Sequence, residues 1–560
     1  MIWVLRDPLR FAAERKAMAD LEAASSWLTI VAWRLLPAGN FGVEFDIEIG
    51  VETFDGLLSY PQAFPHVPPS VRPRTERRWS QLHQYGSGGE LCLEWGPDNW
   101  QPGITGSEMV ASTFRLLQAE DRETGGDVLV PTRHSLTPGQ ELRSEAYRFV
   151  STGPLEEQLA TLGRARPATF RLRHRAGQLL VVLSTLDDEQ EWIDASIPPA
   201  ILEAGYAEPG WVVPVDERPP GLTGGAEALR SLVLGPPDGQ EIRDEVILLR
   251  TPGGDLHASY LRREPDIAIE LRVIRPEPQQ RLETEHAELS ARSVGIVGCG
   301  SLGAKIATSL ARSGVGRFVL VDDDIMRPEN LVRHELDWTA VGRHKTDALA
   351  DRLRLVNPAV IVEGRRHRLG GQESNAGLDG AVSRIAGCDL VIDATADGRA
   401  FNYAAAAAAE GGRAMLWAEV FGGGFGGLIA RSRPGADPEP QKARSIIETW
   451  CGQQGVEVPR AGNDYAGTVG DHVMIADDAA VMAIASHAAA MALDTLMRPT
   501  ASSFPASAYM IGLKTGWIFT APFDTWPIDL GDGASVVGSP DFGDPAVREA
   551  LEDLGRLVGK

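Results

Sequence analysis

The first part of the chain changes between a helical pattern and strand patterns. Apolar residues follow helical spacing over 7–24, whereas 27–36 and 42–50 have the composition of strands, the second with polar and apolar positions alternating. Residues 60–73 are rich in proline. Because each proline fixes φ and removes a ladder donor, this stretch is predicted to be an ordered loop or an edge segment. Helical spacing returns over 106–119, so a small α+β domain is expected.

The middle of the chain has a different pattern. Short runs of β-type residues alternate with turns rich in proline and glycine, which predicts a β-rich connecting domain. The runs are 168–175, 178–185, 245–250 and 267–274. No group of catalytic residues stands out among them, and residues 276–289 are predicted to be a connector that leads into a helix.

From about residue 290, apolar strands alternate with amphipathic helices, predicted at 301–313, 345–356 and 399–410. Continuous apolar strands separated by such helices indicate a parallel sheet covered on both faces. The expected fold class is therefore a multidomain α/β protein. Its predicted domains are 1–150, 151–278 and 279–560.

Composition and charge exclude several classes of protein. The chain of 560 residues is 43% hydrophobic and 23% charged, as expected of folded domains. Its formal net charge of −23 disfavours binding to nucleic acid or to an anionic membrane. The first residues lack the apolar core of a signal peptide, and the apolar stretch 479–496 carries His487 and Asp494, which favours a buried helix over a membrane span. We therefore expect a cytoplasmic protein.

The four cysteines lie far apart and form no CxxC pair, which argues against a structural zinc site and against a disulfide framework. Cys299 and Cys388 are interpreted as structural residues. Cys92, between two leucines, is either a small buried hydrophobe or a nucleophile, and its residue type alone favours burial.

A nucleotide site is predicted where a strand meets a helix. Gly298, Gly300 and Gly303 form a GxGxxG loop after an apolar strand, and Asp322 ends the next strand. Glycines let the backbone approach a phosphate, the helix N-terminus favours an anion, and the acid can bind ribose hydroxyls. The pattern alone leaves the identity of the nucleotide open.

Residues beyond this loop carry a resemblance. The strings VGCGSLG, LVDDD, NLVR and the isolated lysine of GRHK are similar to the ThiF-type adenylation domain of ubiquitin-activating (E1) enzymes and their bacterial relatives, over about 290–500. The resemblance implies ATP and Mg²⁺ as cofactors. It places Asp322 on the ribose and Asp324 among the nucleotide-binding residues. It also makes Asn330, Arg333 and Lys345 ligands of the triphosphate, where Arg333 offers a forked guanidinium and Lys345 a point charge. Arg333 and Lys345 are also predicted to be catalytic.

Further roles follow from the same resemblance. Members of the family have a magnesium-binding Asp in a DxTD motif. Asp397 is the predicted equivalent, although the motif here is offset by one residue. Cys451 is the candidate for the thioester-forming cysteine that some members carry. The zinc-binding CxxC pairs of one branch are missing. The family suggests a homodimer with an arginine supplied in trans, for which Arg281 is named.

The first domain resembles E2 ubiquitin-conjugating enzymes. YPQAFPHVPP is similar to their proline-rich segment, His83 lies near the position of their His-Pro-Asn motif, and GELCL matches G-x-I-C-L. Trp100 and Pro102 then precede a helix, as in E2s. This order makes Cys92 the predicted nucleophile. The Asn that E2s use near the oxyanion is missing, and Gln84 or Tyr85 would have to replace it.

Together the motifs resemble a bacterial E2–E1 fusion, as in type II CBASS antiviral operons. The resemblance implies that a protein's C-terminal carboxylate is adenylated, carried as thioesters on Cys451 and then Cys92, and joined to an amine of a target, such as a lysine. The expected substrate is a cGAS-like nucleotidyltransferase, and the alternative is a ubiquitin-like modifier. Two other classes stay open: an NAD-dependent oxidoreductase and a noncatalytic scaffold.

Overall fold

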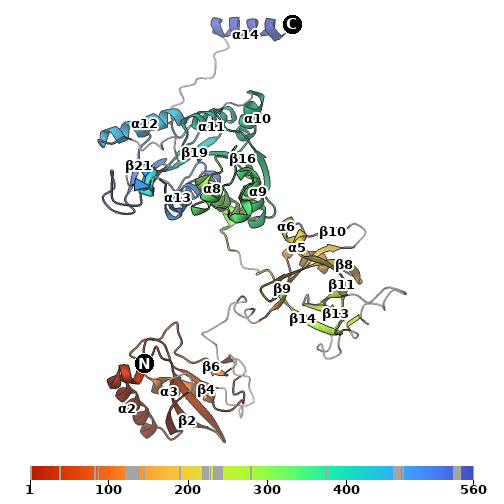
Figure 1. Cartoon of the computed structure of the whole chain (residues 1–560), viewed down its shortest axis with the longest axis vertical. Coiled ribbons are helices and arrows are strands. Elements are labelled where there is room, and N and C mark those ends of the chain that lie inside the picture. Colours follow the sequence, from red (N-terminus) through yellow and green to blue (C-terminus); the bar gives the residue numbers. More distant parts are fainter. Residues whose placement is uncertain are drawn as a thin grey trace. The chain divides into compact units, whose positions relative to one another are not determined.

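The computed structural model divides into two compact units, Met1–Ser144 and Glu145–Lys560. The second unit contains a β-barrel and an α/β domain (Figure 1). The described residues are 3–36, 40–80, 83–85, 88–119, 145–187, 191–216, 244–277, 281–371, 375–457, 475–533 and 544–558, with a few shorter pieces between them.

The first unit packs two helices against a four-stranded antiparallel sheet in the order β1-β2-β3-β4. Its elements are α1 (Trp3–Arg6), α2 (Pro8–Ala24), β1 (Leu28–Leu35), β2 (Phe41–Ile49), β3 (Glu52–Tyr60), β4 (Ser70–Pro73), the hairpin of β5 (Gln84–Tyr85) and β6 (Glu90–Leu91), and α3 (Gly106–Ala119). The predicted helices and first two strands are confirmed. The proline-rich stretch supplies only the edge strand β4, as expected, whereas β3 was not predicted.

A buried carboxylate joins α2, β3 and α3. Glu14 accepts hydrogen bonds from the Tyr60 hydroxyl at 2.8 Å, from the Gly106 N–H at 2.7 Å and from Arg10 Nε at 2.9 Å. Gly106 has no room for a side chain, because a Cβ there would lie 2.0 Å from the Tyr60 hydroxyl oxygen. The start of α3 is thereby fixed against the sheet.

The middle segment forms a barrel. Strand β8 pairs with both β11 and β9, which closes the order β9-β7-β14-β13-β12-β11-β8 on itself, with β10 beside β9. The strands are β7 (Tyr147–Val150), β8 (Arg166–Arg175), β9 (Gln178–Leu186), β10 (Trp192–Ile193), β11 (Tyr206–Pro214), β12 (Glu245–Arg250), β13 (Leu256–Arg262) and β14 (Ile267–Ile274), with short helices α5 (Gly153–Ala160) and α6 (Pro199–Glu203). The predicted β-rich character is confirmed.

The α/β domain is built on one sheet with the order β17-β16-β15-β18-β19-β20-β23-β24. Its first five strands are parallel and the last three continue it in antiparallel fashion. They are β15 (Ser293–Val297), β16 (Arg317–Val321), β17 (Ile361–Arg365), β18 (Leu390–Asp393), β19 (Ala414–Val420), β20 (Gly426–Ser432), β23 (Ala508–Gly512) and β24 (Thr525–Ile528). The parallel part is confirmed; the antiparallel extension was missed.

Helices cover both faces of this sheet (Figure 1). One face carries α8 (Ser301–Arg312), α9 (Lys345–Val356) and α13 (Asp478–Met497); the other carries α10 (Asn375–Ala386), α11 (Gly398–Gly411) and α12 (Pro440–Gln453). Short 3-10 turns lie at η4 (Thr284–Ala291), η5 (Pro328–Val332), η6 (Trp338–Ala340) and η7 (Gly422–Gly424), and a small hairpin joins β21 (Thr468–Val469) to β22 (His472–Val473). The order places a topological switch point between β15 and β18, where such sheets bind ligands.

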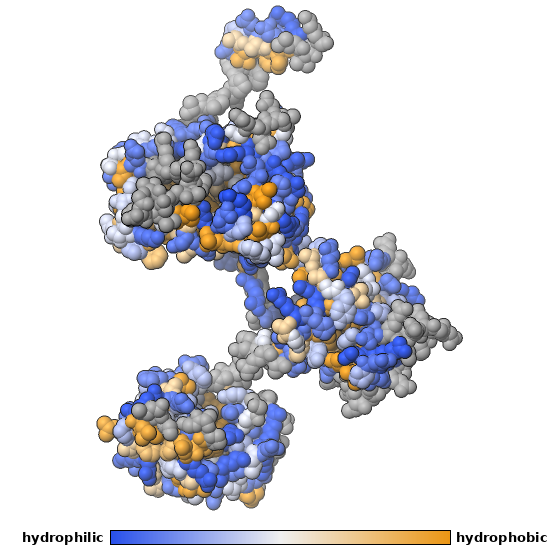
Figure 2. All heavy atoms as spheres, in the orientation of Figure 1, coloured by the Kyte–Doolittle hydropathy of each residue, from blue (hydrophilic) through white to orange (hydrophobic). Residues whose placement is uncertain are grey.

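Helix α13 is apolar along most of its length, whereas the last helix in the chain is amphipathic. By length and composition alone α13 would pass as a membrane span, but 61% of its apolar window is buried, and it packs on α8 and the sheet, as predicted for a core helix. The C-terminal helix α14 (Pro545–Val558) has one apolar and one hydrophilic side, which Figure 2 shows in different colours. Its Leu551 and Leu554 are exposed.

Candidate nucleotide and thiol sites

The glycine loop connects β15 to α8. A Cβ on Gly303 would lie 1.9 Å from the Gly298 carbonyl oxygen, and one on Gly298, whose φ is +89°, would lie 2.8 Å from Thr395 Cγ2. Packing therefore requires glycine at both positions. Gly300 differs, because a Cβ there would have no atom within 4 Å. The loop is closed on its packed side and open at Gly300.

The N-terminus of α8 suits an anion. Its N-cap is Gly300, and no side chain caps its first turn. The first N–H groups of a helix need acceptors, and the helix dipole favours negative charge there. Since this turn follows β15 at the switch point of the sheet, the loop has the geometry of a phosphate site.

Asp322 braces the glycine loop from the neighbouring strand. Its Oδ2 accepts the Cys299 N–H at 2.7 Å, and its Oδ1 accepts the Asp324 N–H at 2.8 Å. Burial raises the pKa of Asp322, whereas the charge of Lys345 lowers it. Each carboxylate oxygen has a second lone pair, so the predicted contact with ribose hydroxyls is compatible with this bracing.

Lys345 and Asp324 form an ion pair at the same edge of the sheet. Lys345 is the first residue of α9 and is buried, and its backbone N–H donates to the Asp324 carbonyl at 3.0 Å. Although partial burial acts in the opposite direction, the hydrogen bond and charge of Lys345 lower the pKa of Asp324. Asp324, predicted as a nucleotide ligand, thus holds Lys345 in place.

Asn330 lies on the turn η5, and Arg333 is the residue that caps its end. Asn330 Oδ1 accepts the Arg327 N–H at 2.9 Å, which closes the turn, and the N–H of Arg333 donates to the Asn330 carbonyl at 3.1 Å. Both side chains are half-buried. This turn lies between β16 and α9 in the chain. The residue after Arg333, which is His334, joins the turn to the glycine loop.

The sequence alone does not identify His334 as a residue of the site. This histidine is buried, its Nε2 lies 3.1 Å from the Cys299 carbonyl oxygen, and its Nδ1 accepts the Leu336 N–H at 3.1 Å. Burial lowers the pKa of His334 to about 4. The available signal was its position next to NLVR, but only the tertiary structure shows what the ring contacts.

Two carboxylates lie between β18 and α11: Asp393 ends the strand and Asp397 precedes the helix. Asp393 is buried and accepts the N–H and hydroxyl of Thr395 at 3.0 and 2.6 Å, while burial raises the pKa of Asp393 to about 6. Asp397 caps α11 by accepting the Arg399 N–H at 2.8 Å. It also pairs with Arg399 and Arg368, at 3.2 and 3.7 Å. Ala396 between them has a φ of +55°.

The magnesium prediction rests on Asp397 alone. The part of the chain that the structure describes contains no group of three or more His, Cys, Asp or Glu placed to hold a metal ion. Mg²⁺ at nucleotide sites is commonly held by one or two carboxylates together with phosphate oxygens, so a single Asp is compatible with it. The register of the motif stays a prediction.

The comparisons identify this part of the chain. Residues 272–492 match the model of the ThiF family. The C-terminal half of the chain contains a ThiF-type domain. Its glycine loop, with Asp322 and Lys345, lies within the matched residues.

Relatives of the ThiF-type domain include uncharacterised protein y4oA of Sinorhizobium fredii, 32% identical over 191 residues that cover 32% of this chain and 31% of that protein. SAMP-activating enzyme E1 of Haloferax volcanii is 39% identical over 121 residues, or 21% of this chain and 40% of that protein. Adenylyltransferase and sulfurtransferase MOCS3 of Mus musculus is 38% identical over 106 residues, or 19% and 22%. The chain thus spans less than half the length of each of these relatives.

Among solved structures, E. coli MccB with ATP matches with 16% identity and a TM-score of 0.33, covering 45% of this chain and 69% of that chain. PaaA matches with 17% identity and a TM-score of 0.35, covering 44% and 75%.

Cys92 lies outside the ThiF-type domain, directly after the β5–β6 hairpin. The pairs Gln84–Leu91 and Tyr85–Glu90 face each other, and the Cys92 N–H donates to the His83 carbonyl at 2.7 Å. Side chains alternate between the faces of a hairpin, so Tyr85 and Cys92 share one face while Gln84 and Leu91 share the other. Cys92 is half-buried.

The two candidate oxyanion donors have different surroundings. Gln84 Oε1 accepts the Trp79 N–H at 2.8 Å, which ties Gln84 to the preceding loop. Tyr85 is 54% exposed; partial burial and then the neighbouring Cys92 raise the pKa of its phenol. The hydroxyl therefore stays protonated at neutral pH and is a hydrogen-bond donor.

Two further hydrogen bonds hold the stretch that follows Cys92 in the chain. Trp100 Nε1 donates to the Pro65 carbonyl at 2.7 Å, which joins the proline-rich segment to the stretch after the cysteine. The Glu94 N–H donates to Ser112 Oγ of α3 at 2.9 Å. The stretch after Cys92 is thus connected both to the proline-rich segment and to α3.

The other three cysteines are buried. Cys451 shares the core face of α12 with Ala443 and Ile447, is 0% exposed, and has its pKa raised to about 11 by burial. A thiol, not a thiolate, is expected there at neutral pH. The thioester role of Cys451 stays a prediction, and it requires α12 to expose the sulfur.

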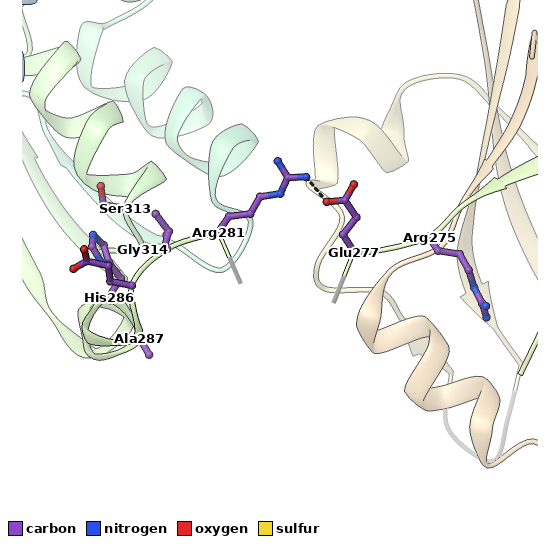
Figure 3. A pocket seen from close by; sticks show the side chains of 9 residues that line it. Arg275, Glu277, Arg281, His286, Ala287, Ser313 and Gly314 are labelled. Carbon is purple, nitrogen blue, oxygen red and sulfur yellow. Dashed lines mark hydrogen bonds and ion pairs between the residues drawn. The ribbon is translucent and has the colours of Figure 1, made fainter. Parts of the chain in front are cut away.

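Arg281, the predicted trans arginine, lies in the segment before η4. Figure 3 shows its guanidinium turned toward Glu277, with which it forms an ion pair. The pocket drawn there also includes Ser313 and Gly314, which follow the last residue of α8. A 12-residue helix is roughly 18 Å long, and the glycine loop of the ThiF-type domain lies at its other end. Arg281 of the same chain is therefore not part of that loop's surroundings.

Proposed function

We propose that this chain is an enzyme that uses ATP to adenylate the C-terminal carboxylate of a protein or peptide. The glycine loop carries this proposal, because it is open at Gly300 and braced by Asp322 within a ThiF-type domain. The names of two relatives, an adenylyltransferase and an activating enzyme E1, support the same chemistry.

The proposed reaction forms a mixed anhydride. A carboxylate oxygen of the substrate attacks the α-phosphorus of ATP, the bond to the bridging oxygen breaks, and pyrophosphate leaves with the electron pair. Arg333 and Lys345 offset the phosphate charge, and the backbone N–H groups at the start of α8 hold the phosphates. Mg²⁺, if held by Asp397, would neutralise further phosphate charge.

We further propose that Cys92 receives the acyl group and passes it to an amine of a target. The thiolate attacks the acyl carbonyl carbon, and collapse of the tetrahedral intermediate expels the previous carrier. Support comes from the E2-like order of motifs and from the partial exposure of Cys92. Tyr85 is the proposed donor to the oxyanion, because it shares a face with Cys92.

Cys451 is proposed as an intermediate carrier only if α12 exposes it. Because its sulfur is buried, direct transfer from the adenylate to Cys92 is the other route. The two routes make different predictions for Cys451→Ala: the first loses the Cys92 thioester, and the second keeps it.

The proposed biological setting is antiviral conjugation in the cytoplasm, with a cGAS-like nucleotidyltransferase as substrate, a lysine-bearing acceptor, and a homodimeric enzyme. Conjugation of a ubiquitin-like modifier is the second candidate, which the E1 in a relative's name supports. An acidic chain of net charge −23 suits neither nucleic acid nor an anionic membrane as a partner.

Calorimetric titration with Mg·ATP and with NAD tests the nucleotide proposal. We expect ATP to bind, and Arg333→Ala to weaken ATP with no effect on the thermal unfolding midpoint. Binding of NAD without ATP would favour the oxidoreductase alternative, and binding of neither would favour the scaffold.

A further inference from the structure

We infer that His334 is a positioning residue for the nucleotide: as a neutral ring with its proton on Nε2, it holds the Cys299 carbonyl and so aims the Gly300 N–H at a phosphate. This inference rests on the proposed binding of ATP at the same site.

Two hydrogen bonds assign the tautomer. The Leu336 N–H can only donate, so Nδ1 of His334 must be an acceptor without a proton. The Cys299 carbonyl can only accept, so Nε2 carries the proton and donates it over 3.1 Å. In a doubly protonated ring the Nδ1–H group would face the Leu336 N–H, and no hydrogen bond could form between these two donors.

The surroundings keep the ring neutral. His334 is 7% exposed, and its burial is the main reason that its pKa falls to about 4. The charges of Lys345 on α9, Lys305 on α8 and Arg333 act in the same direction. No pH near neutrality is therefore expected to change the two hydrogen bonds.

The Cys299 residue is held from both sides. Asp322 accepts its N–H at 2.7 Å and His334 donates to its carbonyl at 3.1 Å. In a planar trans peptide the carbonyl of one residue and the N–H of the next point in opposite directions. Fixing the Cys299 carbonyl toward His334 thus turns the Gly300 N–H away from His334, at the residue where the loop is open.

His334 also connects two groups of predicted ligands. Its backbone N–H donates to the Asn330 carbonyl at 3.0 Å, which ties the main chain of His334 to the turn that leads from Asn330 to Arg333. Through Cys299 the ring reaches the glycine loop. One residue therefore sets the position of the arginine turn relative to the phosphate loop.

The test compares His334→Leu with His334→Gln in the full-length protein. Leu fills a similar space without polar atoms, whereas Gln keeps both a donor and an acceptor. We expect His334→Leu to weaken Mg·ATP roughly tenfold in calorimetric titration, the order of one lost hydrogen bond, and His334→Gln to stay within about threefold of the wild type. Adenosine, which has no phosphate, should bind all three proteins equally.

A second readout reports the protonation of the ring directly and does not depend on ATP binding. Histidine ¹⁵N spectra of the wild type at neutral pH should show one ring with Nδ1 unprotonated and Nε2 protonated, and its signals should disappear in His334→Leu. The inference is overturned if His334→Leu binds ATP as the wild type does, if it weakens adenosine as much as ATP, or if the ring is charged. Wild-type protein that binds no ATP would instead overturn the proposed function, and this inference with it.

Discussion

At the scale of single residues, the glycines of the loop have separable roles. Gly303→Ala should lower the free energy of unfolding by about 1–3 kcal/mol, because its Cβ would overlap the Gly298 carbonyl. Gly300→Ala should leave stability nearly unchanged but weaken ATP, since its methyl group would enter the open side of the loop. Thermal unfolding and calorimetry measure the two effects, and a Gly300→Ala protein with wild-type ATP affinity would contradict the position assigned to the phosphate.

Tyr85→Phe removes one hydroxyl and leaves the ring. We expect acyl transfer from a small glycyl thioester to Cys92, followed by intact-protein mass, to slow roughly 100-fold, as after loss of one oxyanion donor. Alkylation of Cys92 by iodoacetamide forms no oxyanion and should be unchanged. Gln84→Glu keeps the acceptor bonded to the Trp79 N–H and removes the amide donor, so it is the matched control and should transfer normally. Equal slowing of both reactions in Tyr85→Phe would rule out the donor role.

A site residue can be predicted from the sequence when its role depends on residues next to it in the chain. The glycines and Asp322 follow from spacing, because a strand, a tight turn and a helix lie in sequence. The contacts of His334 with Cys299 and of Asp324 with Lys345 join residues 35 and 21 positions apart, and no local pattern encodes them. Tyr85 and Gln84 were equivalent in the sequence until the hairpin register placed them on opposite faces.

At the scale of secondary-structure elements, α12 determines whether Cys451 can react. With Cys451 on its core face and Cys92 half-buried, brief treatment of the native protein with iodoacetamide should modify Cys92 well before Cys451. Peptide mass spectrometry measures the order, and the Cys92→Ala protein is the control. Faster labelling of Cys451 would show that α12 opens readily and would favour the two-carrier route.

The contact between α13 and β20 predicts a pH dependence. Arg431 on β20 and Asp494 on α13 are both buried and lie 2.9 Å apart, with Ser502 and Ser503 also donating to the carboxylate. Although burial acts the other way, these hydrogen bonds lower the pKa of Asp494 to about 2.

Because the folded-state pKa of Asp494 is depressed, its contribution is present above the ordinary pKa of 3.8 and is lost as the pH falls toward about 2. We expect roughly 2 kcal/mol to disappear over that interval, measured by urea unfolding at several pH values. In Asp494→Asn this part of the pH dependence should be missing; if its stability falls with pH as steeply as that of the wild type, the assignment is wrong.

The sequence predicts some elements of the sheet better than others, and the difference has a physical cause. The five parallel strands are separated by helices, and all except the edge strand β17 are largely buried, so they appear as isolated apolar runs. Strands β20, β23 and β24 extend the same sheet without such helices between every pair, and β20 follows the glycine-rich turn η7, which resembles a loop in the sequence. Their sheet partners are set by tertiary pairing.

At the scale of the whole molecule, the first unit, the barrel and the ThiF-type domain each have hydrophobic clusters of their own. Nucleotide residues and Cys92 belong to different units, so mutations should separate their functions. Cys92→Ala should bind ATP with wild-type affinity, and Arg333→Ala should keep a Cys92 that reacts normally with iodoacetamide.

The central claim is that an ATP-activated carboxylate reaches Cys92. The most direct measurement mixes the protein with Mg·ATP and the proposed substrate, a cGAS-like nucleotidyltransferase, then looks for a thiol-sensitive adduct by nonreducing gel and intact mass. We predict an ATP-dependent adduct on Cys92 in the wild type, absent from Cys92→Ala and from Arg333→Ala. An adduct that forms without ATP, or a wild-type adduct that peptide mass maps to a residue other than Cys92 or Cys451, would contradict this account.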